Sequence, residues 1–244
     1  MNINHPTTLR SPSKPLEPAT VFVVDGDATA REALESLFRS AGWSVKPASS
    51  AEEFLSRPRA AVPGCLVAEM SLPGLGGLEL QRLVSDCTEL PLIFVSNCID
   101  IRATVLAMKA GAFDFLTKPF VRDVLLHAVA QAIEHSRTEL RRLARARALQ
   151  ERYESLSRRE REVMSLVVCG RLNKQVGGEL GISEITVKAH RGNLMRKMQA
   201  GSFAELVNMA ASLRRFAYSA AVDVPQELLY AARDLRSPLA AQRL

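Results

Sequence analysis

Four polar residues in the first half of the chain stand where their side chains could do chemistry together. Asp25, Glu69, Ser96 and Lys118 each come at the end of a short apolar run of the kind that forms a buried strand. The carboxyl ends of parallel strands meet at one edge of a sheet, so we expect the four side chains to lie close together. Two carboxylates that face a hydroxyl and an ammonium would suit a divalent cation and a phosphoryl group. The plainer interpretation is that strand ends simply carry polar residues, and four coincident placements argue against it.

The elements that would position these residues alternate between strand and helix. Apolar, β-branched runs predict strands at residues 19–24, 43–47, 65–68, 91–95 and 113–117. Helical patterns predict helices at residues 27–41, 77–85, 101–110 and 124–135, and a short one after Ser50. Short strands that are buried on both faces predict an α/β fold with a five-stranded, doubly wound parallel sheet.

A second candidate site lies toward the C-terminal end, in a run of short predicted helices. The pair Ser157 and Glu160 has the Ser-x-x-Glu spacing that caps a helix, and the same spacing recurs before a fourth helix. Two helices between these, at about residues 173–180 and 184–198, are joined by a tight turn that contains Gly181. This pattern predicts a helix-turn-helix within an all-α, four-helix domain.

The distribution of charge favours DNA as the partner of this domain. Residues 156–216 carry 11 Lys and Arg against five Asp and Glu, whereas residues 17–135 carry 10 against 15. Basic side chains supply attraction to phosphates, and a helix fits the major groove, where its exposed side chains reach base edges. An acidic domain followed by a basic one predicts two functions in one chain. The alternative is a helical protein-interaction module with a solvated basic face.

Length and composition narrow the class of protein further. The 244 residues, 47% of them hydrophobic, suffice for two modest domains. We find no apolar run long enough to cross a membrane and no signal-peptide core, so we expect a cytoplasmic protein without membrane contact. Four cysteines form no CxxC pair and are expected to be free thiols, namely Cys65, Cys87, Cys98 and Cys169.

The C-terminal domain resembles the helix-turn-helix of the LuxR/NarL type. The resemblance is carried by Leu156-Ser157-x-Arg159-Glu160-x-Glu162-Val163, Asn173-Lys174 and Thr186-Val187-Lys188-x-His190. It implies binding to double-stranded DNA. Near base edges we expect Lys188, Ala189, Arg191 and Asn193. Near phosphates we expect Lys174, Gln175, Thr186, Arg196 and Lys197. Gly192 stands where related domains often carry a base-contacting side chain.

The first domain resembles a response-regulator receiver of the FixJ branch of two-component signalling. The resemblance is carried by Val23-Val24-Asp25, Leu72-Pro73-Gly74-x-Gly76-Gly77, Ala107-Met108-Lys109-Ala110-Gly111-Ala112 and Lys118-Pro119-Phe120. It implies a flavodoxin-like fold in which a Mg²⁺ site permits phosphoryl transfer to an aspartate on the third strand. In that family, phosphorylation shifts a Ser or Thr and an aromatic residue and exposes a dimer face. The switch positions here are Ser96, Phe115 and Lys118.

Two departures from the receiver pattern predict a degenerate phosphorylation site. The phosphate-accepting aspartate is Glu69 here, and the acid beside Asp25 that usually binds the metal is Gly26. Glutamate is one methylene longer, which disturbs the in-line geometry on which phosphoryl transfer depends. Mg²⁺ demands near-ideal octahedral oxygens, so we expect at most a weak metal site at Asp25 and no cofactor. Glu69 could instead partly imitate a phosphorylated aspartate by projecting its charge toward Ser96 and Lys118. The alternative is an inert dimer scaffold in which Glu69 only pairs with Lys118.

We therefore predict a DNA-binding transcription regulator, not an enzyme, that acts as a homodimer. Its predicted parts are a disordered extension at residues 1–18, a pseudo-receiver at 19–135, a helical linker at 136–153, a LuxR-type domain at 154–216 and a tail at 217–244. The arginine-rich linker would be a solvated connector or a short coiled coil. RNA polymerase and a histidine kinase are further candidate partners. Two alternatives stay open: a conventional regulator switched by phosphorylation, and a protein-interaction adaptor that has lost DNA binding.

Overall fold

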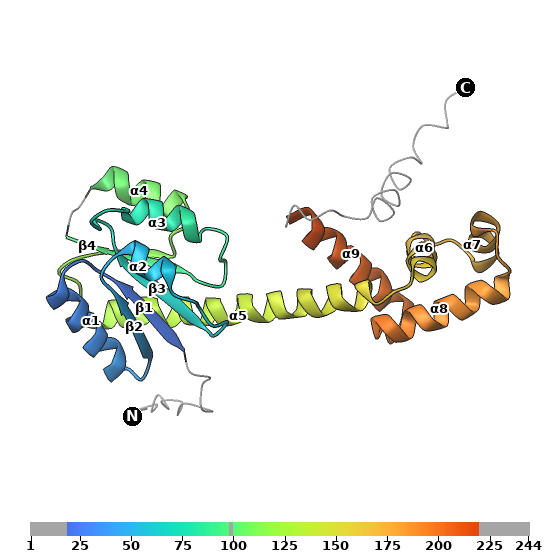
Figure 1. The fold of residues 1–244 in the computed structure, drawn as a ribbon, viewed down its shortest axis with the longest axis horizontal. Coiled ribbons are helices and arrows are strands. Elements are labelled where there is room, and N and C mark those ends of the chain that lie inside the picture. The colour runs from blue at the N-terminus through green and yellow to red at the C-terminus, as the bar shows by residue number, and fades with distance from the viewer. Residues whose placement is uncertain (1–18, 98–99, 220–244) are drawn as a thin grey trace, which may run out of the picture. The chain divides into compact units, whose positions relative to one another are not determined.

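The computed structural model describes residues 19–97 and 100–219, and the chain divides into two compact units between Arg141 and Arg142 (Figure 1). The predictions for residues 1–18, for Cys98 and for the tail from residue 220 onward lie outside the described residues. Within the described ranges, no helix has the length and apolar character needed to cross a membrane.

The first unit contains the predicted five-stranded parallel sheet. Its strands are β1 (Thr20–Val24), β2 (Ser44–Ala48), β3 (Gly64–Glu69), β4 (Leu92–Ser96) and β5 (Asp114–Thr117). Their order across the sheet is β2-β1-β3-β4-β5. Val24 is in register with Ala48 on one side and Ala68 on the other, so the carboxyl ends of β1 and β3 lie together. Ligands of doubly wound sheets bind at this point, where the strand order switches direction.

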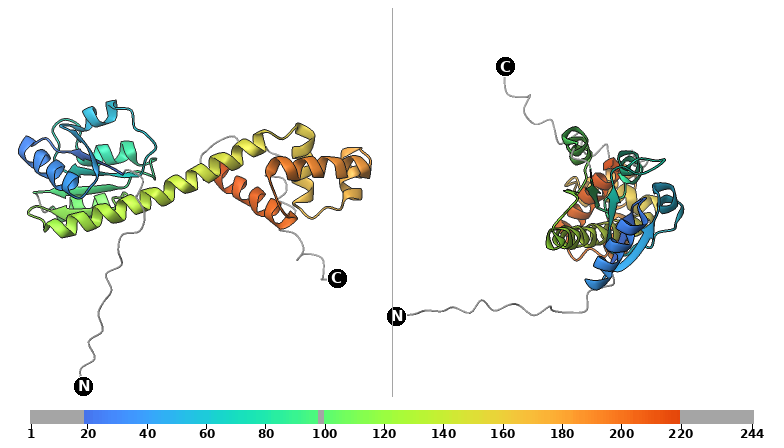
Figure 2. Two further views of the ribbon diagram at one scale, coloured as in Figure 1. Left: turned by 90° about the horizontal axis from the view of Figure 1, so that it is seen from below. Right: turned by 90° about the vertical axis from the view of Figure 1, so that its left-hand side faces the viewer.

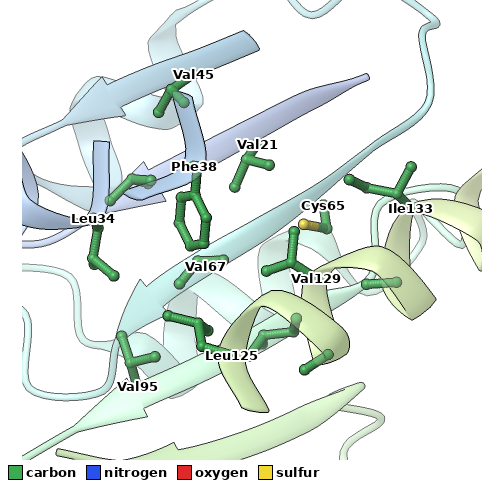
Figure 3. Packing of buried hydrophobic residues seen from close by; sticks show 14 of the residues in the cluster. Val21, Leu34, Phe38, Val45, Cys65, Val67, Val95, Leu125, Val129 and Ile133 are labelled. Atoms are coloured by element: carbon green, nitrogen blue, oxygen red, sulfur yellow. The ribbon is translucent and has the colours of Figure 1, made fainter. Parts of the chain in front are cut away.

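Helices cover both faces of the sheet because alternate residues of each buried strand point to opposite sides. The first-unit helices are α1 (Ala28–Ser40), α2 (Ala51–Ser56), α3 (Gly77–Val84), α4 (Ile101–Lys109) and the start of α5 (Arg122–Glu154). Val21 and Val67 pack with Phe38 of α1 and Val129 of α5 (Figure 3). On the other face, strand residues such as Leu66 pack against α2, α3 and α4.

Helix α5 is longer than the helix predicted at residues 124–135, because no glycine or proline interrupts the chain from Arg122 to Glu154. The predicted linker is therefore helical throughout. Ser136 ties α5 to the amino end of the sheet: its hydroxyl accepts from the Gly64 N–H at 3.0 Å and donates to the Glu89 carbonyl at 2.5 Å. Gly64 must be a glycine, since a Cβ there would lie 2.3 Å from the Thr20 carbonyl oxygen.

Over the residues that the structure describes, the second unit is helical, as predicted, and contains the end of α5 followed by four helices (Figure 2). These are α6 (Arg158–Val167), α7 (Asn173–Leu180), α8 (Glu184–Met198) and α9 (Phe203–Ser219). The turn between α7 and α8 depends on two glycines. Gly181 has a φ of 67°, and a Cβ on Gly177 would lie 2.7 Å from the Ile182 carbonyl oxygen. Leu149 and Tyr153 of α5 pack in the core of this unit.

Candidate functional site

The strand-end pocket brings together three of the four residues predicted to share a site, in one ionic network. The Lys118 ammonium donates to Asp25 Oδ2 at 2.9 Å and to Glu69 Oε2 at 2.7 Å. All three side chains are largely buried: those of Asp25, Glu69 and Lys118 are 3%, 8% and 15% exposed. The single ammonium therefore pairs with both carboxylates, which the fold holds away from water.

The remaining carboxylate oxygens of this network are also bound, and their donors are backbone groups. Glu69 Oε1 accepts from the N–H of Met70 at 2.9 Å and of Ser71 at 3.3 Å. Asp25 Oδ1 accepts from the Asp27 N–H at 2.9 Å. The extra methylene of Glu69 lets its carboxylate turn back onto the loop that follows β3 while it still reaches Lys118. Each of the four oxygens thus has a partner within the protein.

The electrostatic balance of the pocket favours the charged form of Lys118. Burial alone would lower the pKa of this ammonium, but the hydrogen bonds and negative charges of Glu69 and Asp25 outweigh it and hold the pKa above its ordinary value. Lys118 is therefore protonated at neutral pH.

The neighbouring positions complete the pocket without adding a third acid. Ser96 is buried at the end of β4, and its carbonyl accepts from the Lys118 N–H at 2.7 Å. Phe115 is half-buried and packs on Phe94, with ring centroids 6.2 Å apart. The carboxylate of Asp27 caps α1 by accepting from the Thr29 N–H and so does not join the network.

The donor set of this pocket does not fit a bound Mg²⁺. Two carboxylates converge there, both already bound to an ammonium, and Gly26 supplies no third ligand. A Cβ at Gly26 would lie 3.1 Å from Pro73 Cδ, so the place of the missing acid is partly closed. Across residues 19–97 and 100–219 there is no cluster of three acidic, His or Cys side chains that could hold a metal. An octahedral dication would have to displace Lys118 from both carboxylates.

The second candidate site is the outward face of α8. Val187, Leu194 and Met198 are fully buried and fix which side of the helix faces the domain core. The exposed residues recur at helical spacing on the opposite side. They are Ile185, Lys188, Ala189, Gly192, Asn193 and Arg196, and Glu184 at the start of the helix is exposed as well. Three of the four predicted base-edge residues, all but Arg191, lie in this set, and the ion pair of Lys188 with Glu184 at 3.2 Å is open to solvent and easily given up.

Other predicted DNA-contact residues have partners inside the domain. The half-buried Arg191 donates to Asn173 Oδ1 at 2.6 Å and lies over the Phe203 ring, so it connects α8 with α7 and α9. The Lys197 ammonium donates to the buried Glu160 Oε2 at 2.7 Å. These contacts give both cations a positioning role that their sequence pattern did not indicate.

Of the remaining candidates near α7 and the turn, two form helix-capping hydrogen bonds and one is exposed without such a contact among the described residues. Gln175 Oε1 accepts from the Leu172 N–H at 2.9 Å, and the Thr186 N–H donates to Ser183 Oγ at 3.1 Å, so both help begin their helices. Lys174, in the first turn of α7, is exposed and makes no such contact among the hydrogen bonds of the described residues. Lys174 is thus the most open of the α7 candidates for a phosphate.

Sequence reasoning used Glu160 only as a helix cap and left Ile185 out altogether. Glu160 Oε2 accepts from the Ser157 N–H at 2.7 Å as well as from Lys197, and its side chain is 5% exposed. Burial would raise the pKa of this carboxyl, but Lys197 and the hydrogen bonds from Ser157 outweigh burial and hold the pKa below its ordinary value. A signal for Ile185 existed, since it lies one position before Thr186 on the face opposite Val187.

Family comparisons agree with these two units. The model of the response regulator receiver domain matches residues 21–130, and that of the bacterial regulatory proteins of the luxR family matches residues 154–210. The structure of the response regulator StyR superposes with a TM-score of 0.72 at 41% identity, over 80% of this chain and 99% of that one.

Curated relatives match most of the chain. Nodulation protein W of Bradyrhizobium diazoefficiens is 45% identical over 80% of this chain and 86% of its own length. The response regulator protein TodT of Pseudomonas putida is 43% identical over 80% of this chain and 87% of its own length. The transcriptional regulatory protein FixJ of B. diazoefficiens is 38% identical over 78% of this chain and 93% of its own length. The chain belongs to the response regulators of the FixJ type, transcription regulators that join a receiver domain to a LuxR-type DNA-binding domain.

Proposed function

We propose that this regulator is not switched by ordinary aspartyl phosphorylation, acts as a preformed dimer on DNA in the cytoplasm, and is not an enzyme. The observation that carries the proposal is the closed network of Asp25, Lys118 and Glu69, in which every carboxylate oxygen is bound within the protein.

The network opposes phosphoryl transfer in two ways. A nucleophilic oxygen of Glu69 would have to leave either Lys118 or the backbone N–H groups of Met70 and Ser71, and would then be a buried, poorly paired charge. Positioning of the acceptor and neutralisation of the phosphoryl oxygens supply most of the catalysis in this reaction. Both are disturbed here, the first by Glu69 and the second by Gly26.

The same network supports a resting state that resembles the activated one. The Glu69 carboxylate joins the end of β3 to Lys118 beyond β5, so a negative charge already binds this lysine without phosphate. Phe115 is half-buried against Phe94 rather than extended into solvent. We propose that the receiver holds this arrangement permanently.

A second copy of this chain is the proposed occupant of the apolar surface around α4. Ile101, Val105 and Leu106 of α4 are 73%, 44% and 58% exposed. A LuxR-type domain placed on two symmetry-related half-sites calls for a two-fold dimer, and such a surface can pair with itself. RNA polymerase is the proposed partner of the DNA-bound dimer, and the mechanism requires no histidine kinase.

The test is the solution mass of the full-length protein with and without Mg²⁺ plus beryllofluoride, which imitates a phosphoryl group on a receiver aspartate. We expect a dimer whose mass does not respond. The matched variant is Gly26→Asp with Glu69→Asp, which restores the family's acids and should take up one phosphoryl group from acetyl phosphate by intact mass.

Other outcomes would favour the alternatives. A wild-type monomer that becomes a dimer with beryllofluoride would establish a conventional phosphorylation switch. A mass fixed at the monomer would overturn the preformed dimer. Weak binding to mixed-sequence DNA that salt does not change would favour a protein-interaction adaptor, because phosphate contacts are strongly salt-dependent.

A further inference from the structure

The outermost line of α8 is apolar, although the domain is basic. Ile185, Ala189 and Gly192 follow each other at spacings of four and three residues, which places them on one line of the helix. All three are exposed, and Ile185 is 80% exposed. We call these three residues the apolar strip. Lys188 and Asn193 flank it, and Arg196 continues its line toward the end of α8.

Gly192 has no evident role within the chain. A Cβ at this position would have no neighbour within 4 Å, and its φ is not in the left-handed region. Glycine in a helix interior costs stability relative to alanine, because it loses more backbone freedom on folding. Neither packing nor backbone conformation within the protein requires a glycine here. A glycine is explained if the absence of a side chain lets a binding partner approach the helix backbone closely.

Ile185 lies at the end of α8 that enters the groove first in a helix-turn-helix. It is the second residue of the helix, and the N-terminal residues of a recognition helix contact base edges. A single exposed isoleucine is ordinary on a protein surface. Here, however, it is in line with a second apolar residue and a glycine, at the position where the helix would meet DNA.

The chemistry of the major groove identifies the partner of such a strip. Isoleucine, alanine and glycine side chains form no hydrogen bonds, and the apolar group that base edges present in the major groove is the C5 methyl of thymine. We infer that the apolar strip of α8 recognises thymine methyl groups, with Lys188 and Asn193 making the polar base contacts on either side. The inference rests on the proposed DNA-binding function and names what that surface discriminates.

The experiment separates the methyl group from every other feature of the base. The full-length protein is first used to select duplexes from a randomised pool, and each thymine of the selected site is then replaced by deoxyuridine, which lacks only the methyl. At one or two positions of each half-site we expect affinity to fall about three- to fivefold, the value of one buried methyl. Ile185→Ala should abolish the difference at one of these positions, whereas Lys188→Ala should keep it.

Two glycine variants provide a matched pair. Gly192→Ala should raise stability toward unfolding yet lower affinity for the selected duplex at least tenfold. Gly178 lies in the interior of α7, is also exposed, and would have no atom within 4 Å of an added Cβ. Gly178→Ala should therefore raise stability with no loss of DNA affinity.

The outcomes are distinct. Tight binding to the selected duplex with no effect of deoxyuridine at any position would overturn the apolar strip and leave DNA binding intact. No enrichment of any duplex over the pool would overturn the proposed DNA binding and the strip with it. If Gly192→Ala and the wild type bind the selected duplex with equal affinity, the proposed close approach of DNA at Gly192 is wrong.

Discussion

The pocket of the receiver and the outward face of α8 use charged residues in opposite ways. In the pocket, Lys118 binds Glu69 at 2.7 Å and Asp25 at 2.9 Å, and all three side chains are largely buried. On α8, Lys188 and Arg196 are exposed, and the ion pair that Lys188 forms with Glu184 is open to water. Charged side chains are available to a partner when the fold does not bury them with a counter-ion. By this criterion we expect α8 to be a binding surface and the ionic network of the pocket to be structural.

The largest effect should come from breaking the pocket. Lys118→Ala leaves two buried carboxylates without their cation, so we expect a loss of about 3–5 kcal/mol in the free energy of unfolding of the receiver at neutral pH. Trp43, the single tryptophan of the chain, packs on Phe38 and reports receiver unfolding by its fluorescence in urea. Glu69→Gln, which keeps the Asp25 pair, is the milder control. A loss below about 1 kcal/mol for Lys118→Ala would contradict a structural role.

A smaller effect is expected in the second unit from Lys197→Ala. Glu160 would stay buried with only its capping hydrogen bonds, which should cost roughly 2–3 kcal/mol, measured by urea unfolding followed through helical circular dichroism. Lys188→Ala removes another Lys–Glu ion pair, this one exposed at the surface, and should cost less than about 0.5 kcal/mol. Equal losses in the two variants would show that burial does not distinguish them.

The pH dependence of the second unit sharpens the same comparison. The pKa of Glu160 is below its ordinary value of 4.5 in the folded domain, so its stabilising contribution is present above that pH and is lost as the pH falls through the folded pKa. Stability should therefore decline below about pH 4.5. Glu162 has a lowered pKa too, through Arg159 and Arg158, but these partners are exposed. Glu160→Gln should flatten the decline more than Glu162→Gln, and the reverse order would count against the buried pair.

The smallest effect on stability, and a clear one on DNA, is expected from Lys188→Ala. Its unfolding should be nearly unchanged, while the preference among selected duplexes changes because a base contact is lost. Arg196→Ala should lower affinity for all sequences and reduce the slope of log affinity against log salt by about one. Uniform loss over all duplexes for Lys188→Ala would place this lysine on the phosphates instead.

The sequence predicted the fold well because its signals are local and repeated. Alternating strands and helices, caps such as Ser50 and Ser157, and turn glycines such as Gly181 each act over a few residues. The predicted strand at residues 43–47 is Ser44–Ala48 in the structure, a shift of one residue. Helix α5 joins the helix predicted at residues 124–135 to the linker predicted to be helical at residues 136–153.

The partners of individual charges could not be predicted, because they depend on contacts between distant segments. Glu160 and Lys197 are 37 positions apart, and neither periodicity nor composition pairs them. Likewise, the departure at Glu69 indicated a disturbed pocket, but only the structure shows that its second oxygen turns back onto Met70 and Ser71. Arg191 was assigned to bases on its helix position, whereas Asn173 and Phe203 hold it.

Ser136 has a consequence for where the receiver can be cut. The family match ends at residue 130, yet the Ser136 hydroxyl is the group that satisfies the buried Gly64 N–H at the start of the central strand β3. A fragment that stops at residue 130 would leave this donor without its partner and expose the amino edge of β3 to proteases. A fragment that runs through Arg137 keeps this hydrogen bond, so we expect the smallest stable receiver of this protein to extend beyond the residues that the family model matches.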